Sequence, residues 1–466
     1  MSGKLSQTGY ASKKHKWMIT GLLFAQQLVA QQTVTLAQAV ELAIRNYPSI
    51  RISQEQMNAT AAGIDLARTA YLPRVDALAQ VNRATRNNVF GVLLPQSVIP
   101  PMSGPVIGSN NPGSVWGSAV GVLVTWEPFD FGLRSASVSA AGATKARADA
   151  AVKRSQFDVA AAAADAYLTL VAAAETVKAA QAGVDRATTI TRTIAAQVKA
   201  QLRPGADESR AEAELAAAKT QLIQAQQATE VAKATLAQFT LLDPSQIQIA
   251  NKSLIQLPAE QTAAPLNADL NPIAMEQSAI VEQALAQLRT LERSYFPRFY
   301  LQGAAYARGT GAETDGARLG GLNGLAPTTQ DYALGFTATF PIMDFASLRA
   351  REAAQNAAIR SEKARAQQIA LELKAQWNRA VAVWNSARLI AGNTPVQVSA
   401  ARMATTQATA RYQAGLGIID DVAQAQRLLT QAEIDDALAR LNVWRGLLGI
   451  ATASGDIKPF VASATP

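Results

Sequence analysis

The chain has 466 residues, of which 49% are hydrophobic and 6% aromatic, and its formal net charge is +8. Alanine supplies much of the apolar fraction, which is typical of long packed helices. Four lysines lie in the first sixteen residues and the remainder is nearly balanced in charge, so we expect no nucleic-acid partner.

Residues 1–30 have the organisation of a secretory signal peptide. Lys13, Lys14 and Lys16 precede the short apolar segment WMITGLLFA, and Ala30 is a small residue suited to a cleavage site. The apolar segment is too short to span a bilayer as a helix. A buried N-terminal helix is the alternative, but it fits the lysine cluster less well.

The exported chain would contain neither cysteine nor histidine, because His15 is the only histidine and cysteine is absent. Disulfides, thiol nucleophiles and a lipidated N-terminal cysteine are therefore excluded. We expect no catalytic residue, no metal site and no cofactor. A hydrolase based on two carboxylates is the remaining enzyme class, but no constellation of acids indicates one. No later run of eighteen apolar residues predicts a transmembrane helix.

Two parts of the chain follow the same spacing. Pro48 and Pro73 are 25 residues apart, and so are Pro272 and Pro297. Each of these segments is predicted to be a helix followed by a Tyr-x-Pro-Arg turn, in AYLPR and SYFPR. The pattern predicts an internal duplication.

The spacing between two aspartates is also the same in both parts of the chain. Asp130 in WEPFDFGLR precedes Asp207 by 77 residues, and Asp344 in FPIMDFASLR precedes Asp421 by the same number. Only the segment from Pro73 to Asp130, or from Pro297 to Asp344, differs in length between the two repeats. This indicates one loop of variable length in each repeat. The expected units are the repeats 31–241 and 272–453, the linker 242–271 around the outside of the helices, and a disordered tail 454–466.

Pro73 and Pro297 predict turns from helix to strand. Proline removes a backbone donor and disfavours helical geometry in the residue before it, and it is acceptable as the first residue of a strand. Each repeat then supplies a pair of strands, expected at about 73–83, 117–128, 297–307 and 332–341.

The returning strands alternate large apolar residues with small or hydroxylic ones. One face carries Val120, Val122, Val124 and Trp126 in the first repeat, and Tyr332, Leu334, Phe336, Ala338 and Phe340 in the second. This alternation is typical of a membrane β-barrel with a wet lumen, in which Trp126, Tyr332 and Phe340 would form part of an aromatic girdle. A hairpin over a soluble core is the alternative, which export and duplication make less fitting. Residues 84–116 and 307–331 would be external loops.

Helical patterns follow each strand pair, from Arg134 to about Gln201 and from Arg349 to about Gln413, with a break expected at 392–395. Such a helix spans about 100 Å. Seven-residue seams follow Asp207 and Asp421 and indicate coiled-coil packing. Their members are Glu208, Leu215, Leu222, Thr229 and Leu236 with Ala211, Ala218, Ala225, Ala232 and Phe239, and then Val422, Leu429, Asp436, Val443 and Ile450 with Ala425, Ala432, Ala439, Gly446 and Ala453.

Four strands cannot close a barrel, and open sheet edges are not tolerated in lipid. The chain is therefore expected to oligomerise. Two copies would give a barrel filled by its own side chains, whereas three would give twelve strands and room for a lumen.

With these landmarks the chain resembles the TolC-type outer membrane efflux proteins, from about Thr35 to Ala453. The resemblance rests on TLAQAVELAIRNYP, the two proline turns, WEPFDFGLR, FPIMDFASLR and RYQAGLGIIDDVAQAQ. Thr35 and Gln38 also form the sequence pattern of a capping box.

The resemblance implies an α+β membrane protein and a homotrimer. Its twelve-stranded barrel in the outer membrane lipid, with four strands from each chain, would continue into a long periplasmic α-helical coiled-coil barrel. It would serve as the exit duct of a tripartite efflux or type I secretion system. The implied partners are a periplasmic adaptor (membrane fusion) protein and an inner-membrane pump of the ABC, RND or MFS type. The remaining alternative is a soluble periplasmic coiled-coil structural or adaptor protein.

The resemblance also implies a gate at the periplasmic tip, where helices turn and acidic residues ring the pore. Asp421 matches the family's first gate aspartate, Asp420 lies beside it, and Asp207 is the first-repeat equivalent. The family's second aspartate is replaced by Gln424, and residues 202–205 depart from the usual turn. Copies of Asp421 around a pore would repel one another and attract cations. Alternatively, Asp207 and Asp421 only cap the helices that they begin.

Overall fold

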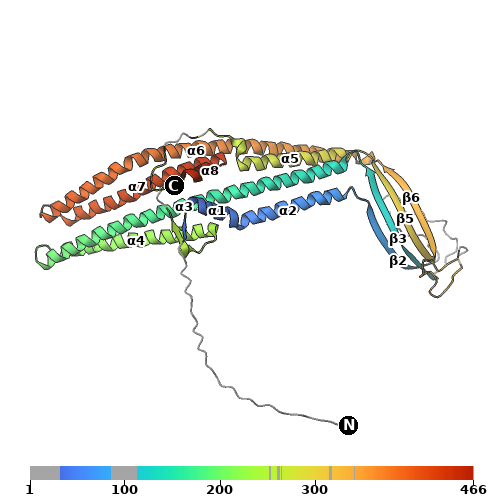
Figure 1. Ribbon diagram of the computed structural model, residues 1–466, viewed down its shortest axis with the longest axis horizontal. Coiled ribbons are helices and arrows are strands. Elements are labelled where there is room, and N and C mark those ends of the chain that lie inside the picture. The colour runs from blue at the N-terminus through green and yellow to red at the C-terminus, as the bar shows by residue number, and fades with distance from the viewer. Residues whose placement is uncertain are drawn as a thin grey trace, which may run out of the picture.

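The computed structural model describes residues 32–85, 113–250, 253–259, 263, 265–313, 317–340 and 342–464. The expected signal peptide and most of the first inter-strand loop lie outside the described residues. The molecule is elongated, with a sheet at one end and two helix turns at the other (Figure 1).

The elements follow the duplication. The helices are α1 (Leu36–Asn46), α2 (Pro48–Thr69), α3 (Leu133–Lys199), α4 (Gly205–Thr240), α5 (Pro272–Arg293), α6 (Phe345–Gln413), α7 (Ile419–Ser454) and α8 (Lys458–Ala464), with 3-10 turns η1 (Pro244–Gln246), η2 (Ala268–Leu270) and η3 (Ile342–Asp344). The strands are β1 (Gln32–Val34), β2 (Arg74–Thr85), β3 (Ser114–Phe129), β4 (Ile247–Ile249), β5 (Arg298–Thr310) and β6 (Thr329–Thr339).

The four long strands form one antiparallel sheet in the order β2-β3-β5-β6. In the middle of the sheet Ala77 lies opposite Val122, Val122 opposite Ala305, and Ala305 opposite Tyr332, and the register of β3 against β5 shifts between Trp126 and Phe129. The two repeats therefore join through β3 and β5, and β2 and β6 remain as the outer strands of the sheet.

Pro73 and Pro297 lie where a helix gives way to a strand. Pro73 stands between the end of α2 and Arg74, the first residue of β2, and Pro297 stands between the end of α5 and Arg298, the first residue of β5. The returning connection in the first repeat is fixed by Asp130, which accepts hydrogen bonds from the backbone of Gly132 and from the backbone and guanidinium of Arg134.

Two helical hairpins, α3/α4 and α6/α7, extend away from the sheet. The predicted seams are confirmed, since their members in α4 and α7 are buried or half-buried throughout. The repeats also match in detail. Thr191 of α3 donates to the carbonyl of Ala211 at 3.1 Å, and its equivalent Thr405 of α6 donates to the carbonyl of Ala425 at 3.0 Å.

The main core lies midway along the rod, where the linker crosses the helices. β1 and β4 pair in parallel there, and the buried hydroxyl of Tyr167 donates to the carbonyls of Val34 and Ala250, each at 2.9 Å. The capping box of Thr35 and Gln38 begins α1 as predicted. Trp444 of α7 donates its indole N–H to the carbonyl of Gln256 in the linker at 2.9 Å.

Two expectations about order were wrong. Residues 458–464 of the supposed disordered tail form α8, because Phe460 and Ala464 are buried against the main core. The break expected at 392–395 does not interrupt α6, which runs through Pro395. Proline removes only one backbone hydrogen bond, and packing along α7 holds the helix together on both sides.

One described helix, α3, is long and apolar enough to pass a composition test for a membrane span. More than half of that window is buried inside the protein. It is the alanine-rich helix against which α1, α2, α4, α5 and α7 pack, so its apolar character reflects this core.

Candidate channel gate and membrane wall

The turns of the two hairpins lie together at the end of the molecule opposite the sheet (Figure 1). α3 ends at Lys199 and α4 begins at Gly205, and α6 ends at Gln413 and α7 begins at Ile419. Both hairpins must turn within five residues, which places the first turns of α4 and α7 close to the last turns of α3 and α6.

Tyr412 is the centre of the contacts between the hairpins at this tip. Its hydroxyl donates to Asp207 Oδ2 of α4 at 2.9 Å. The guanidinium of Arg203, in the α3/α4 turn, lies 4.4 Å from the centre of the Tyr412 ring and donates to the Tyr412 carbonyl. Burial raises the pKa of the Tyr412 hydroxyl to about 12, with the hydrogen bond to Asp207 as the next cause.

A second set of contacts lies one turn further along α4. Arg210 Nε is 3.0 Å from Asp420 of α7 and 3.5 Å from Glu214, and Glu214 is 3.5 Å from Arg427 of α7. Arg210 and Asp420 are about half exposed, so solvent screens this ion pair and its energy is small. We call Arg203, Asp207, Arg210, Tyr412 and Asp420 the tip cluster.

The aspartates do not have the alternative role of helix caps. The N-cap residues are Pro204 for α4 and Ile418 for α7, and neither makes a side-chain capping bond. Asp207 and Asp421 lie inside the first turns, where a negative charge still interacts favourably with the helix dipole. Asp421 is exposed and has no side-chain hydrogen bond or ion pair within the described part of the chain.

The structure thus brings Asp207 and Asp420 into one cluster and leaves Asp421 outside it. The sequence did not predict the other members of the tip cluster, Arg203, Arg210 and Tyr412. The available signal was the position of Tyr412: an aromatic residue at the end of a helix rich in alanine and glutamine, directly before the turn.

The sheet has one strongly apolar face. Residues opposite one another in an antiparallel register share a face, so the faces can be read across all four strands. One face carries Val75, Ala77, Ala79, Val81, Val120, Val122, Val124, Trp126, Leu301, Ala305, Ala307, Tyr332, Leu334 and Phe336. The side chains of Leu334 and Phe336 are 79% and 66% exposed. Such exposure of large apolar side chains is unfavourable in water but not in lipid.

The three residues expected in the aromatic girdle lie at the two ends of this face. Trp126 is near the helix end, where its indole donates to the carbonyl of Tyr71 at 3.1 Å. Phe340 directly follows β6 at the same end, and Tyr332, 89% exposed, is near the loop end of β6. An unpredicted cluster of Phe129, Phe131, Phe296, Phe299 and Phe336 joins the strands to the helix ends.

The opposite face carries pairs of opposite charges among small residues and a few larger ones, namely Leu78, Leu123 and Tyr306. Arg74 pairs with Asp76 at 2.9 Å, Arg298 with Glu127 at 3.4 Å, and Arg308 with Asp331 at 2.9 Å. A face of this kind suits water. The sheet therefore has the two faces that a barrel wall requires between lipid and an aqueous lumen.

Comparisons with known proteins agree with this geometry. The model of the family described as Outer membrane efflux protein matches residues 39–240 and 269–456. The outer-membrane channel OprN has a TM-score of 0.72 and 21% identity, covering 90% of this chain and 89% of that chain.

Two further solved structures are similar. The Campylobacter jejuni CmeC outer membrane channel has a TM-score of 0.70 at 15% identity, covering 96% of this chain and 94% of its own. The Neisseria gonorrhoeae MtrE outer membrane channel, in its open state, has a TM-score of 0.69 at 19% identity, covering 90% and 89%. No curated protein sequence matches this chain significantly.

A two-faced sheet continuous with long coiled helices defines an outer membrane channel with a periplasmic extension. The chain belongs to the outer membrane efflux protein family, and it is an exit duct for efflux across the outer membrane. The family is a class of channels rather than of enzymes. The soluble coiled-coil alternative is not favoured.

Proposed function

We propose that three copies of the chain form a passive duct that is shut at its periplasmic tip and opens there. The observation that carries the gate is the tip cluster, which joins the α3/α4 hairpin to the α6/α7 hairpin through side chains of both. Separating the hairpins at this point would widen the end of the helical barrel.

The case for three copies rests on unsatisfied edges. The outer strands β2 and β6 end the sheet of a single chain, and an unpaired edge is not stable in lipid. Pairing β6 of one copy with β2 of the next closes a wall of twelve strands around a lumen.

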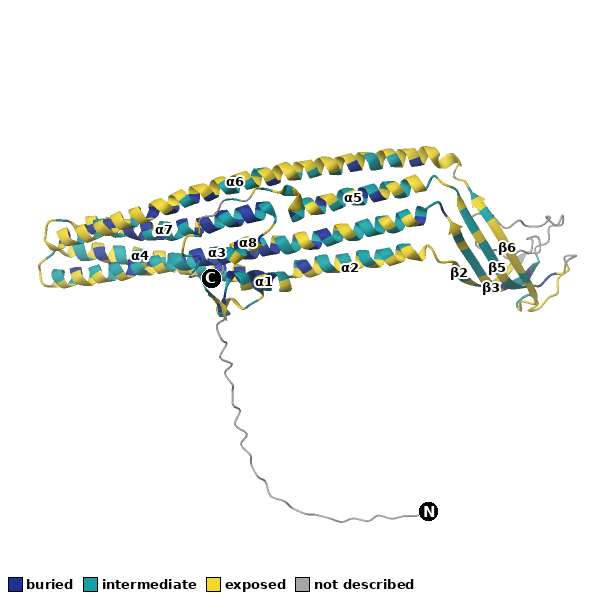
Figure 2. Ribbon diagram, turned by 45° about the horizontal axis from the view of Figure 1, so that its top comes forward, coloured by how far each residue is buried: buried dark blue, intermediate teal, exposed yellow. Residues whose placement is uncertain are grey.

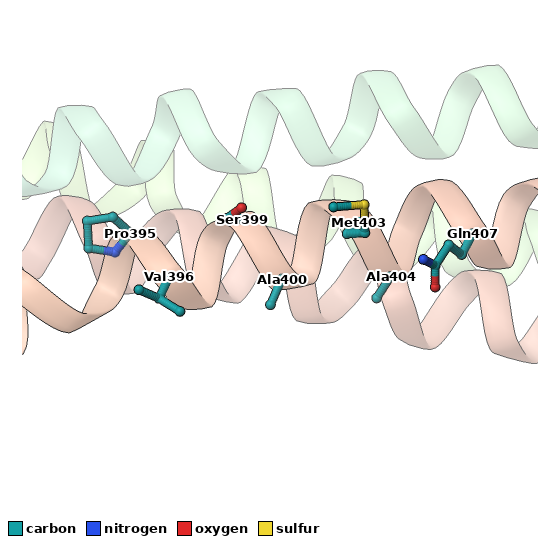
Figure 3. A pocket seen from close by; sticks show the side chains of 7 residues that line it. All are labelled: Pro395, Val396, Ser399, Ala400, Met403, Ala404 and Gln407. Carbon is teal, nitrogen blue, oxygen red and sulfur yellow. The ribbon is translucent and has the colours of Figure 1, made fainter.

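Exposed apolar residues on the outermost helices support the same closure. Ile223 and Val231 of α4 are 63% and 61% exposed, and Val396 and Met403 of α6 are 67% and 60% exposed. Val396 and Met403 line a shallow groove along α6 (Figure 3). In a ring of alternating hairpins, α6 of one copy would lie beside α4 of the next and cover these residues.

The proposed partners are a periplasmic adaptor and an inner-membrane pump of the ABC, RND or MFS type, as in a tripartite efflux or type I secretion system. At the tip, Leu202 and Leu416 are each 73% exposed and Ile418 is 62% exposed. Apolar residues at the ends of helical hairpins suit contact with another helical protein. An adaptor that contacts them would be placed to disturb the tip cluster.

Conductance in planar lipid bilayers tests the gate. We expect the full-length protein to give a small basal conductance and the double variant Tyr412→Phe/Arg210→Ala to give a larger one, because the Tyr412–Asp207 hydrogen bond and the Arg210–Asp420 ion pair between the hairpins are then lost. Lys219→Ala, an exposed change on α4 away from the tip, is the control and should behave as the unmodified protein.

The same preparation tests the duct. The mass of the protein in mild detergent should be that of three chains. A monomer that does not conduct would contradict the duct and favour the soluble coiled-coil protein. A conducting trimer whose conductance the double variant leaves unchanged would contradict the gate alone.

A further inference from the structure

Four weak helix formers follow one another in the middle of α6. Gly392, Asn393, Thr394 and Pro395 all have low helix propensity, and Pro395 has no N–H to donate to the carbonyl of Ala391. The hydroxyl of Thr394 lies 3.5 Å from that carbonyl, which is too far for a strong hydrogen bond. α6 is therefore continuous here but held by fewer backbone bonds than elsewhere.

The helix that packs against this point has its own irregularity. Asp436 occupies a seam position of α7 that is otherwise apolar, in the series Val422, Leu429, Val443 and Ile450. Asp436 Oδ1 accepts from the Thr394 hydroxyl at 2.7 Å, and Asp436 Oδ2 accepts from Arg440 at 2.6 Å. A polar contact, whose strength depends on geometry, thus replaces apolar packing at this level of the seam.

The apolar packing of the hairpin is divided at this level. On the side of the sheet, Trp384, Ala387 and Ala391 pack against Ala439, Val443 and Ile450. On the side of the tip, a separate cluster joins Ala401 to Leu429 and Ala432. Gly446 allows the closest approach on the sheet side, because a Cβ there would lie 2.8 Å from the Cα of Trp384.

The first hairpin has no such interruption. Counted from Asp130 and Asp344, the equivalents of Thr394, Pro395 and Asp436 are Ala180, Gln181 and Leu222. Ala180 is buried and Leu222 half-buried, so the α3/α4 seam stays apolar where the α6/α7 seam becomes polar. At this level, therefore, the second hairpin has a proline and a polar contact that the first hairpin lacks.

We infer that Thr394, Pro395 and Asp436 form a flexible joint about which the tip half of the α6/α7 hairpin bends, while the half near the sheet stays fixed. The inference builds on the proposed gate, because it names the place from which Tyr412 and Asp420 are moved. The joint would belong to the α6/α7 hairpin, between its two separate apolar clusters.

Hydrogen exchange in the reconstituted full-length protein tests the joint independently of conductance. The test variant is Thr394→Ala/Pro395→Gln/Asp436→Leu, which gives the second hairpin the residues of the first. We expect amides at 391–399 of the unmodified protein to exchange about tenfold faster than in this variant. Pro395→Ala alone should give part of the effect, and Gln397→Lys, a change at an exposed residue beside the joint, should give none. Equal exchange rates in the unmodified protein and the triple variant would overturn the joint.

Conductance then tests the joint in the gate. In the Tyr412→Phe/Arg210→Ala background, adding the triple variant should lower the open probability several-fold, because the hairpin has lost its bend point. An unchanged open probability would overturn the role of the joint in opening. If the Tyr412→Phe/Arg210→Ala background itself fails to open, the proposed gate is wrong, and hydrogen exchange still decides whether the joint exists.

Discussion

The two helical hairpins share a plan but differ in what their equivalent residues do. Both have a seam with alanine at one position and larger residues at the other, and both have an aspartate in the first turn of the returning helix. Yet α7 is far more buried than α4 (Figure 2), because α7 packs against α3 as well as α6. The two hairpins therefore keep the scaffold of the duplication, and the residues of the proposed gate lie where the copies differ.

The largest expected effect comes from the seams. Leu429 of α7 is 4% exposed, whereas its equivalent Leu215 of α4 is half-buried. Leu429→Ala should lower the free energy of unfolding by about 3 kcal/mol, and Leu215→Ala by about half as much, because less apolar surface is lost. Leu428→Ala, at an exposed neighbour, is the control. Denaturant unfolding followed by circular dichroism measures the free energy of unfolding of each variant. Equal losses for Leu429→Ala and Leu215→Ala would contradict the prediction.

The equivalent aspartates should have different effects on the channel. Asp207→Ala removes the acceptor of the Tyr412 hydroxyl, and a lost hydrogen bond to a charged group corresponds to about a tenfold rise in open probability. Asp421→Ala breaks no such bond and should leave open probability unchanged while reducing the preference for cations. Single-channel recording in a salt gradient separates the two. The contrast fails if Asp421→Ala opens the channel as much as Asp207→Ala.

The smallest effect is a dependence on pH. In this structure, which the proposed gate makes the closed state, the pKa of Tyr412 is raised from its ordinary value of 10 to about 12, first by burial and then by Asp207. The closed state therefore holds the phenol proton more tightly than an open state with an exposed Tyr412. Its advantage is complete below pH 10 and is lost as the pH rises from 10 through about 12. Conductance should increase over the accessible part of this range, and in Tyr412→Phe this increase should be absent.

Much of the fold could be predicted from spacing alone. Pro73 and Pro297 indicated where helices become strands, and the alternation from Val120 to Trp126 indicated a two-faced sheet. These are local sequence patterns with fixed periods, so they can be recognised without knowing which distant segments pack against them.

The missed features depend on contacts between distant segments. Arg203 and Tyr412 are 209 residues apart in sequence, and no local pattern pairs them. Phe460 became helical because the main core buries it, which composition could not indicate. Pro395 predicted a break, but the packing of two long helices overrode the local preference. The same residue nevertheless marks the inferred joint.

Closure of the wall between copies can be tested most directly by disulfide cross-linking, because the chain contains no cysteine. One cysteine would replace Leu334 on β6, and a second would replace, in turn, Val75, Ala77, Ala79 or Val81 on β2. These strands lie at opposite edges of the sheet within one chain, so a bond between them must join two copies. Oxidation in membranes should give a ladder that ends at three chains for at least one of the four pairs. A ladder that stops at two chains, or the absence of any cross-link in all four, would contradict the trimeric duct.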